Sequence, residues 1–182
     1  MTKQTIWVGI EMSRYGKAGG GLEFGGVNLL GHQLRIALQL TGTDHICVLT
    51  PQGDEESLAI AARHEVREVA PYDFIAMLSE RARAGEEGAV VLLRQIAPVR
   101  DSGIVKQALH LLHEHPVVVS ACPKDEPCLA FEVRRISQFS AAAIANPLAG
   151  EYLMEIDPSC YAEYTRPEHA QAVTDALARW NA

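Results

Sequence analysis

The residues of this chain best suited to chemistry lie in one glycine-rich loop that also carries two basic side chains. Residues 13–26 read SRYGKAGGGLEFGG and hold six of the chain's 14 glycines. Between a strand and a helix, the backbone N–H groups of such a loop and the helix N-terminus form a binding site for phosphate. The loop therefore predicts nucleotide binding, although a glycine-rich composition is also typical of a flexible surface loop. The predicted contacts are Arg14, Lys17 and the backbone of Gly16, Gly19, Gly20 and Gly21.

Alternating strand-like and helix-like patterns place this loop in an α/β fold. The runs ICVLT (46–50), AVVLL (89–93) and VVVSA (117–121) are apolar at successive positions, as in strands buried on both faces. The sequence predicts a three-layer α/β/α sandwich with a mostly parallel, Rossmann-like nucleotide-binding sheet. We expect strands at residues 5–10, 45–50, 66–69, 89–93 and 117–121, and helices at 27–40, 54–64, 72–83 and 103–113.

The pattern is less regular towards the C-terminus. Residues 128–133 and 151–156 can each form a strand, and a last helix is expected to have Thr165 as its N-cap and Pro167 in its first turn. Ligands of open parallel sheets bind outside the carboxyl ends of the strands. The site is therefore expected among residues 11–26, 51–53, 94–102, 123–127 and, if their strand reaches the same edge, 157–167.

Bulk composition limits the class of protein. A chain of 182 residues with 48% hydrophobic residues is expected to form a single domain, residues 1–182, with a real core. The net charge of −7 argues against a protein that coats nucleic acid, but not against a local nucleotide pocket. No apolar run reaches the roughly 18 residues of a membrane span and no signal peptide is recognisable, so we expect a cytoplasmic protein without a membrane partner. The four cysteines form no C-x-x-C pair, which argues against a zinc site. Cys47 is expected to be a buried free thiol.

Four segments resemble motifs of one enzyme family. They are SRYG (13–16), FGGVNLLGHQLRIAL (24–38), VVLLRQIAPVR (90–100) and EIDPSCYAEYTRPEHAQAV (155–173). In order and spacing the chain resembles the nucleotidyltransferase superfamily, and most closely the cytidylyltransferases of the CMP-sialic acid synthetase (acylneuraminate cytidylyltransferase) type.

This resemblance implies transfer of a nucleotidyl group from CTP to a small acidic sugar, with release of pyrophosphate, for surface polysaccharide biosynthesis. Arg14 and Lys17 would be the catalytic cations that neutralise the leaving pyrophosphate. The nucleotide would also contact Ser13, Arg94 and Arg100, and Glu163 would bind Mg²⁺. The family also suggests a homodimer, although its dimerising segment is shortened here.

The chain departs from the family where the chemistry is expected. Gly19 stands at the position of the signature lysine, Arg94 replaces a glutamine, and Thr165 replaces one of two metal-binding acids. Such losses are typical of a catalytically degenerate nucleotide-binding or interaction protein on the same fold, which is the alternative reading.

Two smaller groups have alternative interpretations. His110, His113 and His115 could bind a metal or stabilise the end of a helix through its dipole, and the helix role is favoured. Arg134 and Arg135 could bind a carboxylated sugar or lie on the surface, and the surface is favoured.

Overall fold

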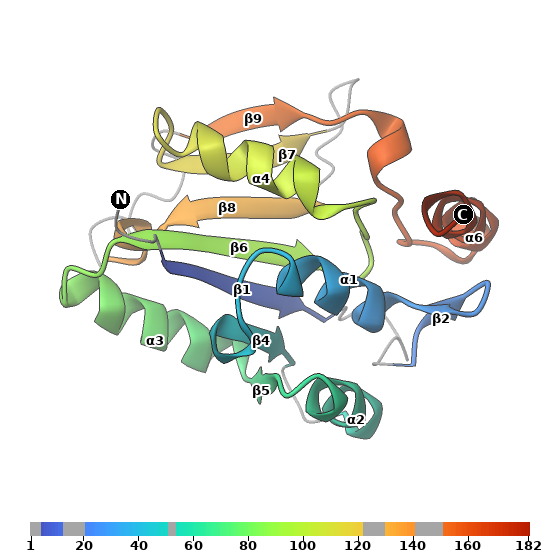
Figure 1. Ribbon diagram of the computed structural model, residues 1–182, viewed down its shortest axis with the longest axis horizontal. Helices are drawn as coiled ribbons and strands as arrows, with labels where there is room; N and C mark the ends of the chain where they lie inside the picture. Colours follow the sequence, from blue (N-terminus) through green and yellow to red (C-terminus); the bar gives the residue numbers. More distant parts are fainter. Residues whose placement is uncertain (1–4, 13–20, 51–53, 122–129, 141–150) are drawn as a thin grey trace.

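A seven-stranded mixed sheet forms the centre of the protein, as the computed structural model shows (Figure 1). The model describes residues 5–12, 21–50, 54–121, 130–140 and 151–182. The strand order is β5-β4-β1-β6-β8-β7-β9. The strands are β1 (Thr5–Glu11), β4 (Ile46–Leu49), β5 (Arg67–Val69), β6 (Gly88–Arg94), β7 (Val117–Ala121), β8 (Phe131–Arg135) and β9 (Glu151–Glu155).

All neighbouring strands pair in parallel except those next to β8. In the centre of the sheet, Val8 of β1 lies opposite Ile46 of β4 and Val91 of β6. β8 is antiparallel to both β6 and β7. The mostly parallel sheet predicted from the apolar runs is therefore confirmed. The strand expected at residues 128–133 instead ends at Arg135.

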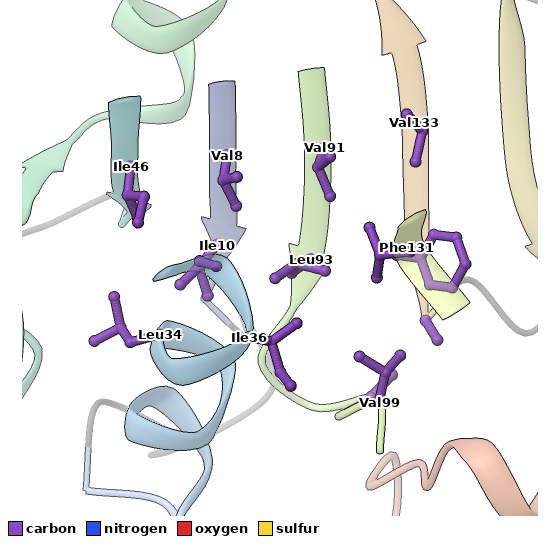
Figure 2. Packing of buried hydrophobic residues seen from close by; sticks show 14 of the residues in the cluster. Val8, Ile10, Leu34, Ile36, Ile46, Val91, Leu93, Val99, Phe131 and Val133 are labelled. Atoms are coloured by element: carbon purple, nitrogen blue, oxygen red, sulfur yellow. The ribbon is translucent and has the colours of Figure 1, made fainter. Parts of the chain in front are cut away.

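Helices cover both faces of the sheet, which confirms the three-layer arrangement. α1 (Leu29–Leu38), α2 (Glu55–Arg63) and α4 (Ser102–Leu111) pack on one face through a large apolar cluster. Figure 2 shows its centre, where Ile46, Val8, Val91 and Val133 form a row across four strands. α3 (Pro71–Arg83) and the short helix η2 (Ile136–Phe139) cover the other face through Phe74, Leu78 and Phe139.

The helix predicted to start at Val27 begins two residues later. Residues 27–28 form β3 (Val27–Asn28), which pairs with β2 (Glu23–Phe24) in a hairpin. Gly25 and Gly26 form the turn with φ values of 56° and 78°, a backbone that side-chain-bearing residues rarely adopt. Asn28 then caps α1, because its Oδ1 accepts from the Gly31 N–H at 2.9 Å.

The last helix also starts later than predicted. α6 (Ala170–Trp180) follows a 3₁₀ turn at Pro167–His169, and no side chain caps either helix. Thr165 is therefore not an N-cap; its hydroxyl lies 3.3 Å from Nδ1 of His169. α6 packs through Val173 and Leu177 on the β2–β3 hairpin, beside the edge where β1 and β6 end (Figure 1).

Candidate functional site

The carboxyl ends of the parallel strands meet at one edge of the sheet, on the right of Figure 1. The chain leaving β1 remains bonded to its neighbours, since the Met12 N–H donates to the Leu49 carbonyl at 3.1 Å and the Gln95 N–H donates to the Glu11 carbonyl at 3.0 Å. Gln95, directly after β6, therefore lies beside Glu11, close to the last described residue before the glycine-rich loop. The described segments that were predicted to form the site thus lie at the edge where such sheets bind their ligands.

Two segments far apart in the sequence run side by side along this edge. The Arg100 N–H donates to the Cys160 carbonyl at 2.7 Å, the Ala162 N–H to Pro98 at 3.0 Å and the Tyr164 N–H to Ile96 at 2.7 Å. Val99 and Tyr161 form an antiparallel bridge. Residues 157–167 therefore reach the same edge as residues 94–102, as expected from the strand pattern.

Helix α1 fixes the segment after β6 through two buried polar side chains. His32, which is 3% exposed, lies with Nε2 2.7 Å from the Val99 carbonyl. The Gln33 amide donates to the Arg94 carbonyl at 2.7 Å. Both acceptors are main-chain carbonyls, which every residue has. These bonds therefore fix the backbone of the segment whatever its side chains are.

The protonation state of His32 follows from its neighbours. The Arg35 guanidinium can only donate, and its Nη2 lies 2.9 Å from His32 Nδ1. Nδ1 is therefore the acceptor, and Nε2 carries the hydrogen donated to Val99. Burial, and secondarily the nearby Arg35 charge, lower the pKa of His32 below its ordinary value of 6.5.

The C-terminal helix is tied to the same network. Arg35 Nη2 also donates to Oδ1 of Asn181 at 3.0 Å. The Trp180 indole N–H donates to the Ser159 carbonyl at 3.0 Å. α1 thus bonds to the segment after β6, and α6 bonds to the segment after β9.

Most of the glycine-rich loop lies outside the described residues. This applies to Ser13, Arg14, Gly16, Lys17, Gly19 and Gly20, so their predicted contacts stay predictions. Gly21 is described, and a Cβ there would lie 2.0 Å from Oε2 of Glu56. The loop therefore returns against the first turn of α2.

The two arginines predicted for the nucleotide both lie at this edge and both form ion pairs. Arg94 Nε lies 3.5 Å from Glu11 Oε2. Arg100 Nε donates to Asp101 Oδ2 at 2.8 Å. This bond is the main reason why the pKa of Asp101 is lowered, and the second oxygen of Asp101 caps α4 by accepting from the Gly103 N–H at 2.8 Å.

Glu163 is exposed and lies between the two residues whose N–H groups bond to Pro98 and Ile96. Within the described ranges, no group of three or more histidine, cysteine or acidic residues could hold a metal ion. A hard cation that takes one carboxylate together with substrate phosphates needs no such group. The exposed carboxylate of Glu163 fits that limited role.

The remaining candidates have structural partners. The rings of His110 and His113 meet edge to face, with 5.5 Å between their centroids. The ring of His115 stacks on that of Tyr152, with 4.3 Å between centroids. Arg135 donates to the Leu112 carbonyl at 2.9 Å, next to the end of α4. Cys47 is a buried free thiol, as predicted.

In the portion of the chain that the structure describes, no helix has the length and apolar character needed to cross a membrane.

Comparisons at the level of sequence find no match, either to a family model or to a curated protein. Comparison of structures does. 4-Diphosphocytidyl-2C-methyl-D-erythritol synthase from Anaerococcus prevotii aligns over 97% of this chain and 99% of its own, with a TM-score of 0.72 and 12% identity. The chain therefore has the same α/β fold as this synthase.

Two further structures with the same fold extend the comparison. A cytidylyltransferase from Leptospira borgpetersenii aligns over 96% of this chain and 86% of its own, with a TM-score of 0.65 and 17% identity. CMP:2-keto-3-deoxy-manno-octonic acid synthetase complexed with CTP covers 97% of this chain and 99% of its own, with a TM-score of 0.65 and 12% identity. The structural neighbours thus include cytidylyltransferases, and the sialic acid type is not singled out among them.

Reasoning from the sequence missed His32 and Gln33 as residues that shape the site. Both stand within LLGHQLRIAL, where they share a helix with its buried leucines. Two adjacent polar residues in so apolar a helix are the signal that could have marked them, because buried polar side chains require a bonding partner.

Proposed function

We propose that this protein binds CTP at the carboxyl edge of its sheet and transfers the cytidylyl group to a small acidic sugar. The observation that supports the proposal is the segment after β6, which His32 and Gln33 hold beside the end of β1. The cytidylyltransferase neighbours support a nucleoside triphosphate as the partner. The preference for an acidic sugar rests on the sequence resemblance.

In the proposed reaction, a sugar hydroxyl oxygen attacks the α-phosphorus of CTP. The new P–O bond joins CMP to the sugar, the bond to the β-phosphate breaks, pyrophosphate leaves, and the hydroxyl proton passes to solvent. Arg14 and Lys17 neutralise the charge that develops on the leaving pyrophosphate. When bound, Mg²⁺ adds charge neutralisation at the phosphates, and Glu163 is the residue of this chain that would hold it.

One observation favours the alternative of a nucleotide-binding protein without catalysis. Arg94 and Arg100 are each already paired with a carboxylate, Glu11 and Asp101 respectively. A triphosphate would have to compete with these acids, and Gly19 stands where the family has a lysine. Both readings share the nucleotide site and differ only in turnover.

Thermal unfolding with millimolar CTP, and with each other nucleoside triphosphate, tests binding. A ligand that binds only the folded state stabilises it by RT ln(1 + [L]/Kd), so binding raises the Tm. Arg14→Ala is expected to lose most of the shift, and Arg134→Ala, whose arginine pairs with Glu132 at mid-sheet, to keep it. Equal losses in both variants contradict the proposed site.

Pyrophosphate release with Mg²⁺ and candidate acidic sugars tests catalysis. Release that depends on sugar supports the transferase. A CTP-dependent Tm shift without release supports the alternative, and no shift with any nucleotide overturns both.

A further inference from the structure

A cavity of about 330 Å³ opens on the face of the sheet opposite to α1. It lies between the start of α3, the short helix η2 and the strands β1, β4, β6 and β8. This volume is at the lower end of the range for small-molecule pockets, about 300–1,000 Å³. Of the predicted nucleotide contacts that the structure describes, Gly21, Arg94 and Arg100, none lines it.

The floor of this cavity is apolar and is built around a glycine. Leu49, Phe74 and Leu92 converge over Gly9 of β1, where a Cβ would lie 2.9–3.0 Å from all three side chains. Leu49 and Phe74 are at most 5% exposed. Because these side chains pack against one another over the strand, the floor is preformed.

The rim carries charges that cancel in pairs. Glu132 and Arg134 form one ion pair, and Glu11, which also lines the cavity, pairs with Arg94. Each pair is electrically neutral. An anionic ligand would meet two carboxylates and a guanidinium already occupied by one of them, so the rim disfavours a phosphate or a sugar acid.

An exposed apolar side chain stands at the mouth. Ile75 on the first turns of α3 lines the cavity and is 45% exposed. Together with the floor it offers apolar contact on two sides, while the Gln138 amide provides a donor and an acceptor.

We propose that this cavity binds a small, uncharged, mainly apolar organic molecule with one hydrogen-bonding group. The volume of the cavity requires a small ligand, its apolar floor favours an apolar one, and its neutral rim favours an uncharged one. The cavity lies on the face of the sheet opposite to α1, and the proposal does not depend on the proposed transferase activity.

Indole is a suitable probe, because it is flat, uncharged and has one N–H donor. Protein labelled at isoleucine and leucine methyl groups is titrated with indole and followed by NMR. We expect saturable shifts of the methyls of Ile75, Leu49 and Leu92 with a Kd of about 1 mM or tighter. The methyls of Leu58, which is 47% exposed on α2, serve as the internal control and should not shift.

Two matched variants locate the binding. Ile75→Trp places bulk at the mouth and is expected to weaken binding about tenfold or more, whereas Leu58→Trp at an equally exposed site on α2 should leave it unchanged. Both changes are at exposed positions, and far-UV circular dichroism checks the fold. Indole-3-acetate, the anionic analogue, should bind at least about tenfold more weakly than indole.

Four outcomes overturn the proposal. They are no saturable shift at the cavity methyls, equal shifts at Leu58, undiminished binding by Ile75→Trp, and equal affinity for indole-3-acetate.

Discussion

Removing His32 tests whether α1 positions the segment after β6. In His32→Ala, the Val99 carbonyl, fully buried in the wild type, loses its 2.7 Å partner, which costs about 1–3 kcal/mol. The lost ring leaves a cavity and frees Arg35, so the total loss of unfolding free energy is expected to be about 3 kcal/mol.

The same residue predicts a pH dependence. The pKa of His32 is lower in the folded protein than the 6.5 of the unfolded chain, so the unfolded state binds the proton more readily. The contribution of neutral His32 is therefore complete above about pH 6.5 and is lost as the pH falls towards the folded-state pKa. Each pH unit by which folding lowers the pKa of His32 corresponds to about 1.4 kcal/mol of unfolding free energy.

Glutamine supplies a matched variant without a titrating ring. In His32→Gln the amide can donate to Val99 and accept from Arg35, so stability near pH 8 should stay within about 1 kcal/mol of wild type. Between about pH 7.5 and 5, the wild type should lose more stability than this variant. His113→Gln, at an exposed position, is the control for general loss of a histidine.

Urea unfolding at each pH measures these differences, with the m-value checked for constancy. The reasoning is refuted if His32→Ala loses less than about 1 kcal/mol, or if His32→Gln keeps the full pH slope of the wild type. An equal change of slope in His113→Gln refutes the assignment to His32.

Packing, capping and thiol burial give the remaining predictions. Gly88→Ala should cost about 2–3 kcal/mol, because its Cβ would lie 2.4 Å from a backbone oxygen of β1, whereas Gly42→Ala meets open space and should be neutral within about 1 kcal/mol by urea unfolding. Asp101→Ala should lose about 1 kcal/mol through the lost cap of α4, and Asp101→Ser should recover most of it; equal losses would contradict the capping role. Burial shields the Cys47 thiol and raises its pKa, so Cys160 should be alkylated about tenfold faster than Cys47, or more, as measured by peptide mass spectrometry. Similar rates for the two cysteines would argue against the burial of Cys47.

The apolar runs predicted the central strands, and the strand expected at residues 151–156 is confirmed as β9 (Glu151–Glu155), but the direction of β8 was not predictable. Runs such as AVVLL are buried on both faces and read directly as strands of a parallel sheet. β8 reads FEVRR: Arg134 pairs with Glu132 of the same strand, and Arg135 bonds to the Leu112 carbonyl beside the end of α4. Its antiparallel direction depends on this tertiary setting, which local pattern does not encode.

The candidate site was predictable as an edge and not as a set of contacts. β6 and β9 both end at this edge, which puts residues 94–102 and 157–167 on the same side of the sheet, but β8 and β7 stand between the two strands, so the pairing itself was not predictable. The ion pair of Arg94 with Glu11 could not be anticipated, because it depends on the register between β1 and β6. The hairpin that turns at Gly25 and Gly26 was not predicted, because these glycines were interpreted as part of a phosphate-binding loop.

The bridge between Val99 and Tyr161 also bears on how the molecule folds and opens. It closes a loop of roughly sixty residues with an isolated bridge and three backbone hydrogen bonds, whereas Val8 and Val91, which are further apart in the sequence, belong to a full ladder between β1 and β6. Because such long-range contacts are rewarded only after their neighbours are in place, this edge is expected to assemble late. The same edge would then be the first to open in the native state, with the amides of Arg100, Ala162 and Tyr164 exchanging together as one cooperative unit.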